Sequence, residues 1–360
     1  PGDSPYVVGP PRVRTTLAEG VGSISVQARA SLPVDTDVEL RVWGPRGELV
    51  HRAERSLASG GEVEWSETVT VDSPQLWWPW DHGDQPLYQV ELVAAGNRIW
   101  SGRTGIRSVG LERTAEVTRY SFNEGPSFVR GTSYFPDVYL SRLSRPRFLR
   151  DLRAIRDAGF NMVRVHVHIE SSDFYELCDE LGLAVMQDTD FNWTHPDTDE
   201  WANRLVGIVE AAMHRLDRHP SLITWVCLNE PGNTAPNDET ARVAMDVNPG
   251  PALYRAIAAN DPTRPIIKGS YCEEDLDSGD SHNYTGSLWA PDVHYTDIDG
   301  TTEKLNTEFG FDSPGDLSAL RRWARLVDGG DARVFRARQE QRGPRTPRHD
   351  CRDDGLHGDV

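Results

Sequence analysis

The first part of the chain alternates between apolar and polar residues in short runs. Between residues 21 and 111, stretches such as 24–28 and 38–42 place an apolar side chain at every second position, and glycine or proline separates the runs. A period of two is typical of strands with one buried face, and short strands at this spacing indicate an antiparallel sandwich. We therefore predict an immunoglobulin-like β-sandwich at residues 20–112, preceded by a linker at residues 1–19.

After Tyr120 the pattern changes, and strand-like runs alternate with stretches of helical spacing. One helix is predicted at residues 145–158, where Ser144 can cap the start and Gly159 ends it. Two further helices carry apolar stripes at intervals of three and four residues. The stripes of the three helices are Phe148, Leu152 and Ile155; Phe174, Leu177, Cys178 and Leu181; and Leu205, Ile208, Val209, Ala212 and Leu216.

Seven apolar runs before, between and after these helices predict strands. Strands that alternate with helices pair in parallel, and this number of units predicts a (β/α)8-type TIM barrel at residues 113–327. After a helix near 317–326 the sequence becomes rich in Arg, Asp and Pro, so we expect the barrel to be incomplete at its C-terminus and residues 328–360 to form an irregular or disordered tail. The predicted strands are 128–130, 162–169, 183–187, 222–228, 265–268, 291–294 and 304–307.

Composition excludes several classes of partner. The formal net charge is −18 and the chain has two lysines, which argues against nucleic acid, because phosphate binding needs a basic face. Apolar runs of 18 residues are absent, so we expect no membrane partner; the opening residues lack the features of a signal peptide, so we expect a cytoplasmic location. The oligomeric state stays open. The four cysteines lie too far apart for a zinc or disulfide pattern, so we expect buried free thiols and neither metal nor cofactor: Cys178, Cys227, Cys272 and Cys351.

Two glutamates follow predicted strands about eighty residues apart. Glu230 lies in Leu-Asn-Glu-Pro, and Glu308 lies in Asn-Thr-Glu-Phe-Gly. In a TIM barrel, chemistry takes place at the face where the strands end, so both carboxyl groups are expected there. Two carboxyl groups about 5–5.5 Å apart are the catalytic pair of a retaining glycoside hydrolase. Either motif alone is a common loop sequence; their joint position on one predicted barrel favours the catalytic interpretation.

Longer motifs resemble glycoside hydrolase family 2, which contains β-galactosidases, β-glucuronidases and β-mannosidases. The resemblance covers nearly all of residues 20–325 and rests on Leu-Trp-Trp-Pro at 76–79, on residues 130–136 and on residues 174–182. Met-Gln-Asp at 186–188 and His-Pro-Ser-Leu at 219–222 are most similar to the β-mannosidase members. Family members usually carry a sugar-binding sandwich before the middle sandwich domain, and the present sequence shows none.

The resemblance implies roles for four residues. Glu230 would be the acid/base and Glu308 the nucleophile, with Arg164 beside Glu308 to keep it charged. Asn229 would hold the sugar 2-hydroxyl. A proton donor must be protonated near neutral pH, so we expect surroundings that raise the pKa of Glu230. The alternatives are a barrel-wall ion pair for Arg164 and a turn cap for Asn229.

Six further residues near strand ends are candidate sugar contacts. His166 and His168 alternate on the second predicted strand and should therefore share a face; His168 is the better candidate. They face either inward or outward, and a metal pair is the other possibility, but two histidines without a clear third ligand favour sugar contact. For His294 the alternative is ordinary packing, and for Trp193 it is loop packing. Asp188 ranks lower, since it can be a buried barrel partner. The candidates are His166, His168, Asp190, Trp193, His294 and Tyr295.

The expected function is retaining hydrolysis of terminal β-linked sugars in an oligosaccharide or glycoside, in the manner of a β-mannosidase. The alternative is a catalytically impaired family 2 remnant that binds carbohydrate without cleaving it.

Overall fold

The computed structural model describes residues 4–59, 61–114, 117–135, 137, 139–193, 195–231, 247–271, 280–284 and 304–309. It divides into two compact units, one of residues 1–282 and 303–307, the other of residues 283–302 and 308–360. His294 and Tyr295, the predicted strand at 291–294, the predicted helix near 317–326 and the tail at 328–360 lie outside the described residues.

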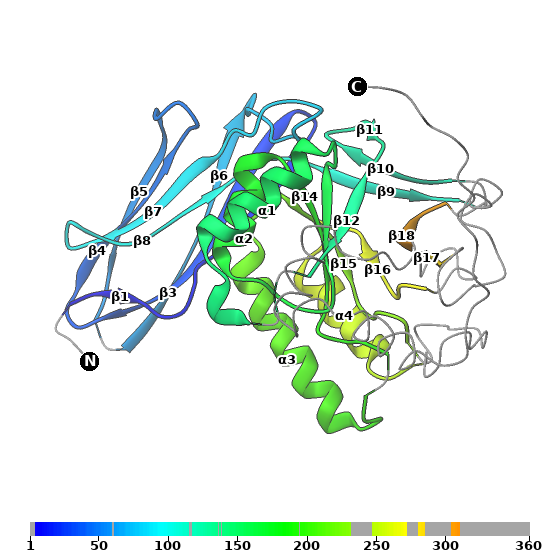
Figure 1. The fold of residues 1–360 in the computed structure, drawn as a ribbon. Coiled ribbons are helices and arrows are strands. Elements are labelled where there is room, and N and C mark those ends of the chain that lie inside the picture. Colours follow the sequence, from blue (N-terminus) through cyan, green and yellow to red (C-terminus); the bar gives the residue numbers. More distant parts are fainter. Residues whose placement is uncertain are drawn as a thin grey trace, which may run out of the picture. The chain divides into compact units, whose positions relative to one another are not determined.

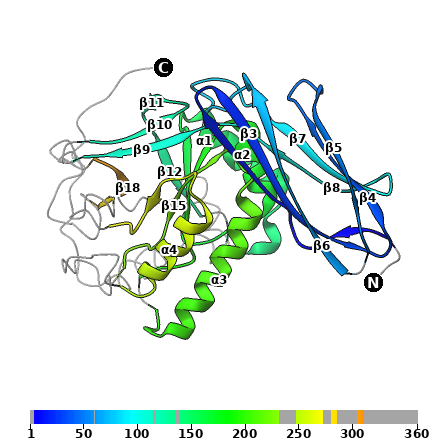
Figure 2. The same cartoon turned by 180° about the vertical axis from the view of Figure 1, so that it is seen from behind.

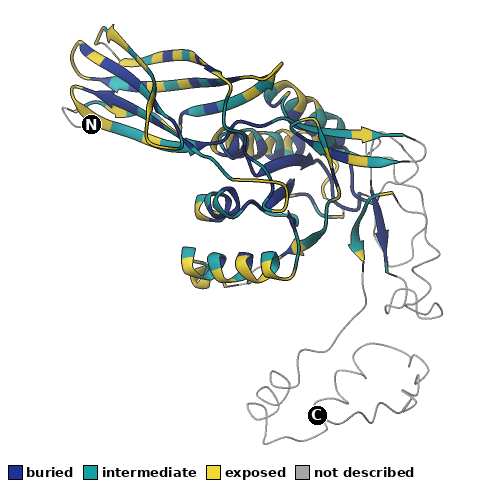
Figure 3. Cartoon of the chain, turned by 90° about the horizontal axis from the view of Figure 1, so that it is seen from above, coloured by how far each residue is buried: buried dark blue, intermediate teal, exposed yellow. Residues whose placement is uncertain are grey.

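Two antiparallel sheets form the N-terminal sandwich (Figure 1). The inward side chains at alternate positions are buried, Ile24, Leu40 and Val90 among them, and Figure 3 shows this alternation along the strands. The first sheet consists of β3 (Val21–Leu32) with its partners β1 (Tyr6–Val7), β2 (Arg12–Ala18) and β6 (Gly61–Asp72). The second has the order β5 (Leu49–Leu57), β4 (Thr36–Trp43), β7 (Tyr88–Ala94) and β8 (Asn97–Thr104).

The sandwich extends into the predicted linker at residues 1–19. Strand β2 pairs with β3 along its whole length, and Val13 is 1% exposed within the core. The Pro/Gly-rich opening obscured a short alternating run, Val13, Thr15 and Leu17, whose backbone groups are satisfied by β3. The linker assignment is therefore wrong for Arg12–Ala18.

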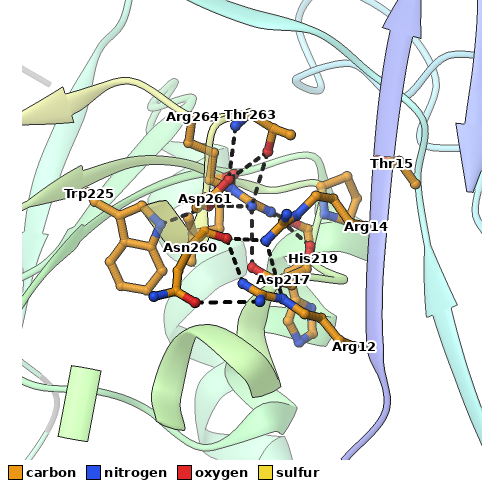
Figure 4. A network of polar contacts seen from close by, with 12 residues as sticks. Arg12, Arg14, Thr15, Asp217, His219, Trp225, Asn260, Asp261, Thr263 and Arg264 are labelled. Atoms are coloured by element: carbon orange, nitrogen blue, oxygen red, sulfur yellow. Dashed lines mark hydrogen bonds and ion pairs between the residues drawn. The ribbon is translucent and has the colours of Figure 1, made fainter. Parts of the chain in front are cut away.

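Two arginines of β2 join the sandwich to the barrel (Figure 4). Arg12 and Arg14 both donate to Oδ2 of Asp217 and to the backbone carbonyl of Asn260. The side chain of Asp217 is fully buried, and Arg264 lies 3.9 Å from its other oxygen. A buried carboxylate thus receives guanidinium groups from both domains, which satisfies a charge that would otherwise be costly to bury.

A small antiparallel sheet connects the two domains. It has the order β11 (Gly125–Ser127), β10 (Thr118–Phe122) and β9 (Val109–Arg113). Tyr120 and Phe122 are each 1% exposed and pack with apolar side chains of the barrel strands, such as Met186. These aromatic rings therefore pack on the inner side of the barrel strands.

The barrel strands form a parallel sheet in sequence order. Its strands are β12 (Gly131–Tyr134), β13 (Met162–Val165), β14 (Ala184–Asp188), β15 (Leu222–Val226) and β16 (Ile266–Ile267). The predicted strand at 128–130 is wrong, because the first parallel strand begins at Gly131. Phe128 is 77% exposed, and the Asn161 side chain binds the carbonyl of Phe128 and the amide of Arg130. Of the contacts that the structure describes for residues 128–130, only that of the Arg130 carbonyl reaches the neighbouring strand, where it accepts from the amide of Met162.

The helices cover the outer face of the sheet, with α1 beside α2 and α3 beside α4 (Figures 1 and 2). Their buried stripes follow the prediction, except that Ile208 is 45% exposed and Met213 takes its place in the core. Ser144 occupies the N-cap position of α1, but its side chain makes no capping bond to the described residues. The helices are the 3-10 helix η1 (Leu140–Arg142), α1 (Arg145–Asp157), α2 (Ser172–Leu181), α3 (Asp199–Leu216) and α4 (Gly250–Asn260).

Strands β17 (Ser281–Asn283) and β18 (Asn306–Phe309) form a two-stranded sheet. The prediction placed Glu308 after a strand at 304–307, whereas it lies within β18. Among the helices that the structure describes, none is long and apolar enough to cross a membrane. Cys178 and Cys227 are buried free thiols, as predicted; Cys272 and Cys351 lie outside the described residues.

Candidate active site

The alternation of side chains along the barrel strands brings Arg164 and Asp188 together. Val163 and Val165 pack with the helices, whereas Met162 packs on the inner side, so Arg164 also points inward. Side chains alternate in the same way along β14, so Asp188 also points inward. Arg164 donates from Nε and from a terminal nitrogen to the two oxygens of Asp188, over 3.1 and 2.8 Å. Burial raises the pKa of Asp188, but the charge and hydrogen bonds of Arg164 and His166 outweigh it and lower the pKa.

This ion pair anchors Asn229. Arg164 donates to Oδ1 of Asn229 over 2.6 Å and to the hydroxyl of Ser270 over 3.1 Å. Asn229 forms backbone bridges to Asn192 and Ser270, and its amide donates to Oδ1 of Asn192 over 2.8 Å. The sheet therefore continues past the ends of β14, β15 and β16. Arg164 forms the barrel-wall ion pair that was its alternative; its contact with Glu308 stays a prediction.

Glu230 follows Asn229 and is 8% exposed. Its Oε1 lies 2.8 Å from Nδ1 of His282, and its Oε2 accepts a hydrogen bond from the indole N–H of Trp193 over 2.5 Å. Burial raises the pKa of Glu230, but the His282 and Trp193 hydrogen bonds, with the charges of His282 and Arg164, outweigh it and hold the pKa below its usual value. The expectation of a raised pKa is wrong for this geometry, because both carboxylate oxygens have donors.

Glu230 and three residues in the loops after neighbouring strands have a left-handed backbone conformation. Val167, Trp193, Glu230 and Tyr271 have φ angles of 49°, 60°, 47° and 62°. Each follows one of the successive strands β13 to β16. Such a conformation costs a residue other than glycine about 1–2 kcal/mol. Strained residues of this kind gather at functional sites, so their shared position points to a site at the carboxyl ends of these strands.

The two candidate histidines lie beyond the strand on which they were predicted. Strand β13 ends at Val165, so the alternation argument does not apply to them. Instead both rings lie against Phe135, with centroids 6.2 Å away for His166 and 5.7 Å for His168. His168 binds the carbonyl of His166 through Nδ1 and Oε1 of Glu170 through Nε2, at 2.8 and 3.0 Å.

The remaining predicted residues lie in different settings. Asp190 is exposed after β14, and Trp193 is 53% exposed although its N–H is bound to Glu230. Glu308 is half-buried and accepts a hydrogen bond from the hydroxyl of Tyr284. Glu230 belongs to the first compact unit and Glu308 to the second, so their convergence stays a prediction.

His282 was not among the residues predicted from the sequence. Strand β17 reads Ser-His-Asn, without the apolar alternation that would have marked it as a strand. The only sequence feature that pointed to a functional histidine was its position two residues after Asp280. No neighbouring sequence feature linked it to Glu230, which lies 52 positions earlier.

Known protein families match both halves of this architecture. The model described as "Glycosyl hydrolases family 2" matches residues 8–107, and the one described as "Glycosyl hydrolases family 2, TIM barrel domain" matches residues 141–285. The chain belongs to glycoside hydrolase family 2. The predicted order of a sandwich followed by a TIM barrel, and the resemblance to this family, are confirmed.

The names of the relatives of this family 2 chain describe two enzyme activities. An exo-β-D-glucosaminidase of Hypocrea jecorina is 28% identical over 76% of this chain and 32% of its own length. A β-mannosidase B of Aspergillus clavatus is 33% identical over 51% of this chain and 23% of its own length. The crystal structure of a β-D-mannosidase from Dictyoglomus thermophilum is similar with a TM-score of 0.74 and 25% identity, over 88% of this chain and 41% of that one. The chain thus spans about a third or less of the length of these curated relatives.

Proposed function

We propose that this family 2 protein is a retaining glycosidase that hydrolyses terminal β-linked sugars, with Glu230 as acid/base and Glu308 as nucleophile. The observation that carries the proposal is the setting of Glu230. Its carboxyl group is buried beyond β15, between the N–H donors of His282 and Trp193, among loops with a strained backbone.

The reaction proceeds in two displacements. The carboxylate of Glu308 attacks the anomeric carbon while Glu230 gives its proton to the leaving oxygen, which forms a glycosyl ester and frees the alcohol. Water then attacks the same carbon, Glu230 takes up one of its protons, and Glu308 is released as a carboxylate. Asn229 is held by Arg164 and Asn192 with its amide fixed, as a contact to the 2-hydroxyl requires.

Two sugars are the first candidates. The relatives named β-mannosidase favour a β-mannoside, and those named exo-β-D-glucosaminidase favour a β-glucosaminide. Aryl glycosides of mannose, glucosamine, galactose and glucuronic acid separate these possibilities by the ratio of their kcat/KM values.

The experiment compares Glu308→Gln and Glu230→Gln on aryl β-mannosides, with Glu200→Gln on the exposed face of α3 as control. Glu308→Gln should abolish turnover, and Glu230→Gln should reduce it by roughly 10²–10⁴-fold on substrates with poor leaving groups. Proton NMR of the first product should show the β-anomer. Undiminished turnover in Glu308→Gln, or an α-anomer as first product, would overturn the proposal.

One observation favours the alternative of a carbohydrate-binding remnant. The hydrogen bonds of His282 and Trp193 outweigh burial and hold the pKa of Glu230 below its usual value, whereas a proton donor needs a raised pKa. Calorimetric binding of mannobiose by the folded protein, with no mannose released, would support this alternative.

A further inference from the structure

His282 lies between two carboxyl groups. Its side chain is fully buried, with Nδ1 2.8 Å from Oε1 of Glu230 and Nε2 3.8 Å from Oδ1 of Asp280. The ring stacks on Tyr271, with centroids 5.2 Å apart and an angle of 8° between the planes. A buried ring held through one face and directed at a catalytic carboxyl through one nitrogen has a defined orientation.

Asp280 is fixed in turn by the loop after β16. The hydroxyl of Ser270 donates to Oδ2 of Asp280 over 3.1 Å, and the amide of Tyr271 donates to Oδ1 over 3.0 Å. Ser270 also accepts a hydrogen bond from Arg164, so Asp280 is linked to the ion pair in the barrel wall. The support behind His282 therefore continues into the rigid part of the sheet.

The chemistry of the groups decides the direction of the bond to Glu230. An ionised carboxylate only accepts hydrogen bonds, so Nδ1 of His282 is the donor. A charge-assisted bond of this kind is roughly twice as strong as a neutral one.

We propose that His282, held by Asp280 and Tyr271, is a positioning residue for Glu230. It fixes the orientation of the carboxyl group and stabilises the carboxylate that forms when Glu230 passes its proton to the leaving oxygen. The inference rests on the proposed function in one respect, the assignment of Glu230 as the acid/base.

The stabilisation grows as negative charge develops on Glu230, so it lowers the barrier rather than only binding the substrate. A leaving group that departs without a proton does not need this help. The contribution of His282 should therefore depend on the leaving group, which a merely structural role would not produce.

The test compares His282→Leu with His282→Asn, whose amide can replace the Nδ1 donor. His214→Asn on the exposed face of α3 is the matched control. For phenyl β-mannoside, kcat/KM should fall by roughly 10²-fold in His282→Leu and recover in part in His282→Asn. For 2,4-dinitrophenyl β-mannoside the loss should be at least tenfold smaller. Equal losses on both substrates in a folded variant would overturn the inference.

A second measurement does not depend on turnover. Imidazole ¹⁵N NMR of the whole chain, with the His282 signals assigned by their loss in His282→Asn, should show Nδ1 protonated in the wild type. In Glu230→Gln, which loses the carboxylate acceptor, the Nδ1–H proton signal of His282 should move upfield. An unchanged Nδ1–H signal would overturn the inference even if the protein cleaved no glycoside, whereas absent turnover with the expected change in this signal would refute only the proposed function.

Discussion

The indole N–H of Trp193 reaches Oε2 of Glu230 over 2.5 Å and links the loop after β14 to the loop after β15. More than half of the Trp193 side chain surface remains exposed. The same ring can therefore hold the carboxyl by its edge and offer an apolar face to a sugar. Plain loop packing, the alternative for Trp193, does not account for the bond to Glu230.

Replacement of Trp193 by Phe should keep an aromatic face and remove the hydrogen-bond donor. The pKa of Glu230 is held down in part by that bond, so the pKa should rise. A general acid with a higher pKa stays protonated to higher pH, so the alkaline limb of the kcat profile should move upward. The profile with phenyl β-mannoside measures the change, and Trp201→Phe on α3 is the control; a downward shift would contradict the account.

The ion pair of Arg164 and Asp188 should matter for stability when one partner is removed. Arg164→Met leaves a carboxylate that is 1% exposed without its main partner, and removal of one member of a buried pair costs about 3–5 kcal/mol. Arg150→Met on α1 removes an arginine that is 69% exposed and should change the free energy of unfolding by less than about 1 kcal/mol. Urea unfolding measures both.

The same pair has a defined pH dependence. The folded-state pKa of Asp188 is lowered, so its contribution is present above the unfolded pKa of about 3.9 and is lost as the pH falls through the folded value. The stability difference between wild type and Arg164→Met should therefore shrink in acid. A constant difference from neutral pH into strong acid would contradict this origin.

The arginine cluster of β2 should couple the sandwich to the barrel. Asp217→Asn removes the fully buried charge that Arg12 and Arg14 share, and should cost about 3 kcal/mol because it leaves two partly buried guanidinium groups without their anion. Thermal unfolding by calorimetry should show a lower Tm and a separation of the two domain transitions. Asp199→Asn in the first turn of α3, which is exposed, should leave a single transition at nearly the original temperature.

His168 should respond to its partner Glu170. Burial lowers the pKa of His168, but its hydrogen bonds to the carboxylate of Glu170 and the carbonyl of His166 outweigh burial and raise the pKa. A raised folded-state pKa stabilises the protein below the unfolded value of about 6.5, and this contribution is lost as the pH rises through the folded value. Glu170→Gln should lower the pKa of His168 in an NMR titration and cost more stability at acidic than at alkaline pH; an unmoved titration would exclude the interaction.

The sequence by itself determined the elements and their order. Periods of two and of three to four residues arise from which face of a strand or helix is buried, so they gave the sandwich, the parallel barrel strands and the stripes of α1 and α2. They also placed Glu230 at the end of β15, because position along a strand is a local property. Strand β2 and the start of β12 were missed, because the first is a short run beside a Pro/Gly-rich stretch and a side chain binds the backbone just before the second.

Only the tertiary structure decided the surroundings of Glu230. His282 is 52 positions away and Trp193 is 37, and neither spacing leaves a periodic trace in the sequence. The pKa of a buried carboxyl depends on the balance between desolvation and such donors, so its direction followed from their placement and not from the residue type. Trp193 and Glu230 lie in loops after two neighbouring parallel strands, and His282 lies on β17, so these groups come together only once the strands have assembled.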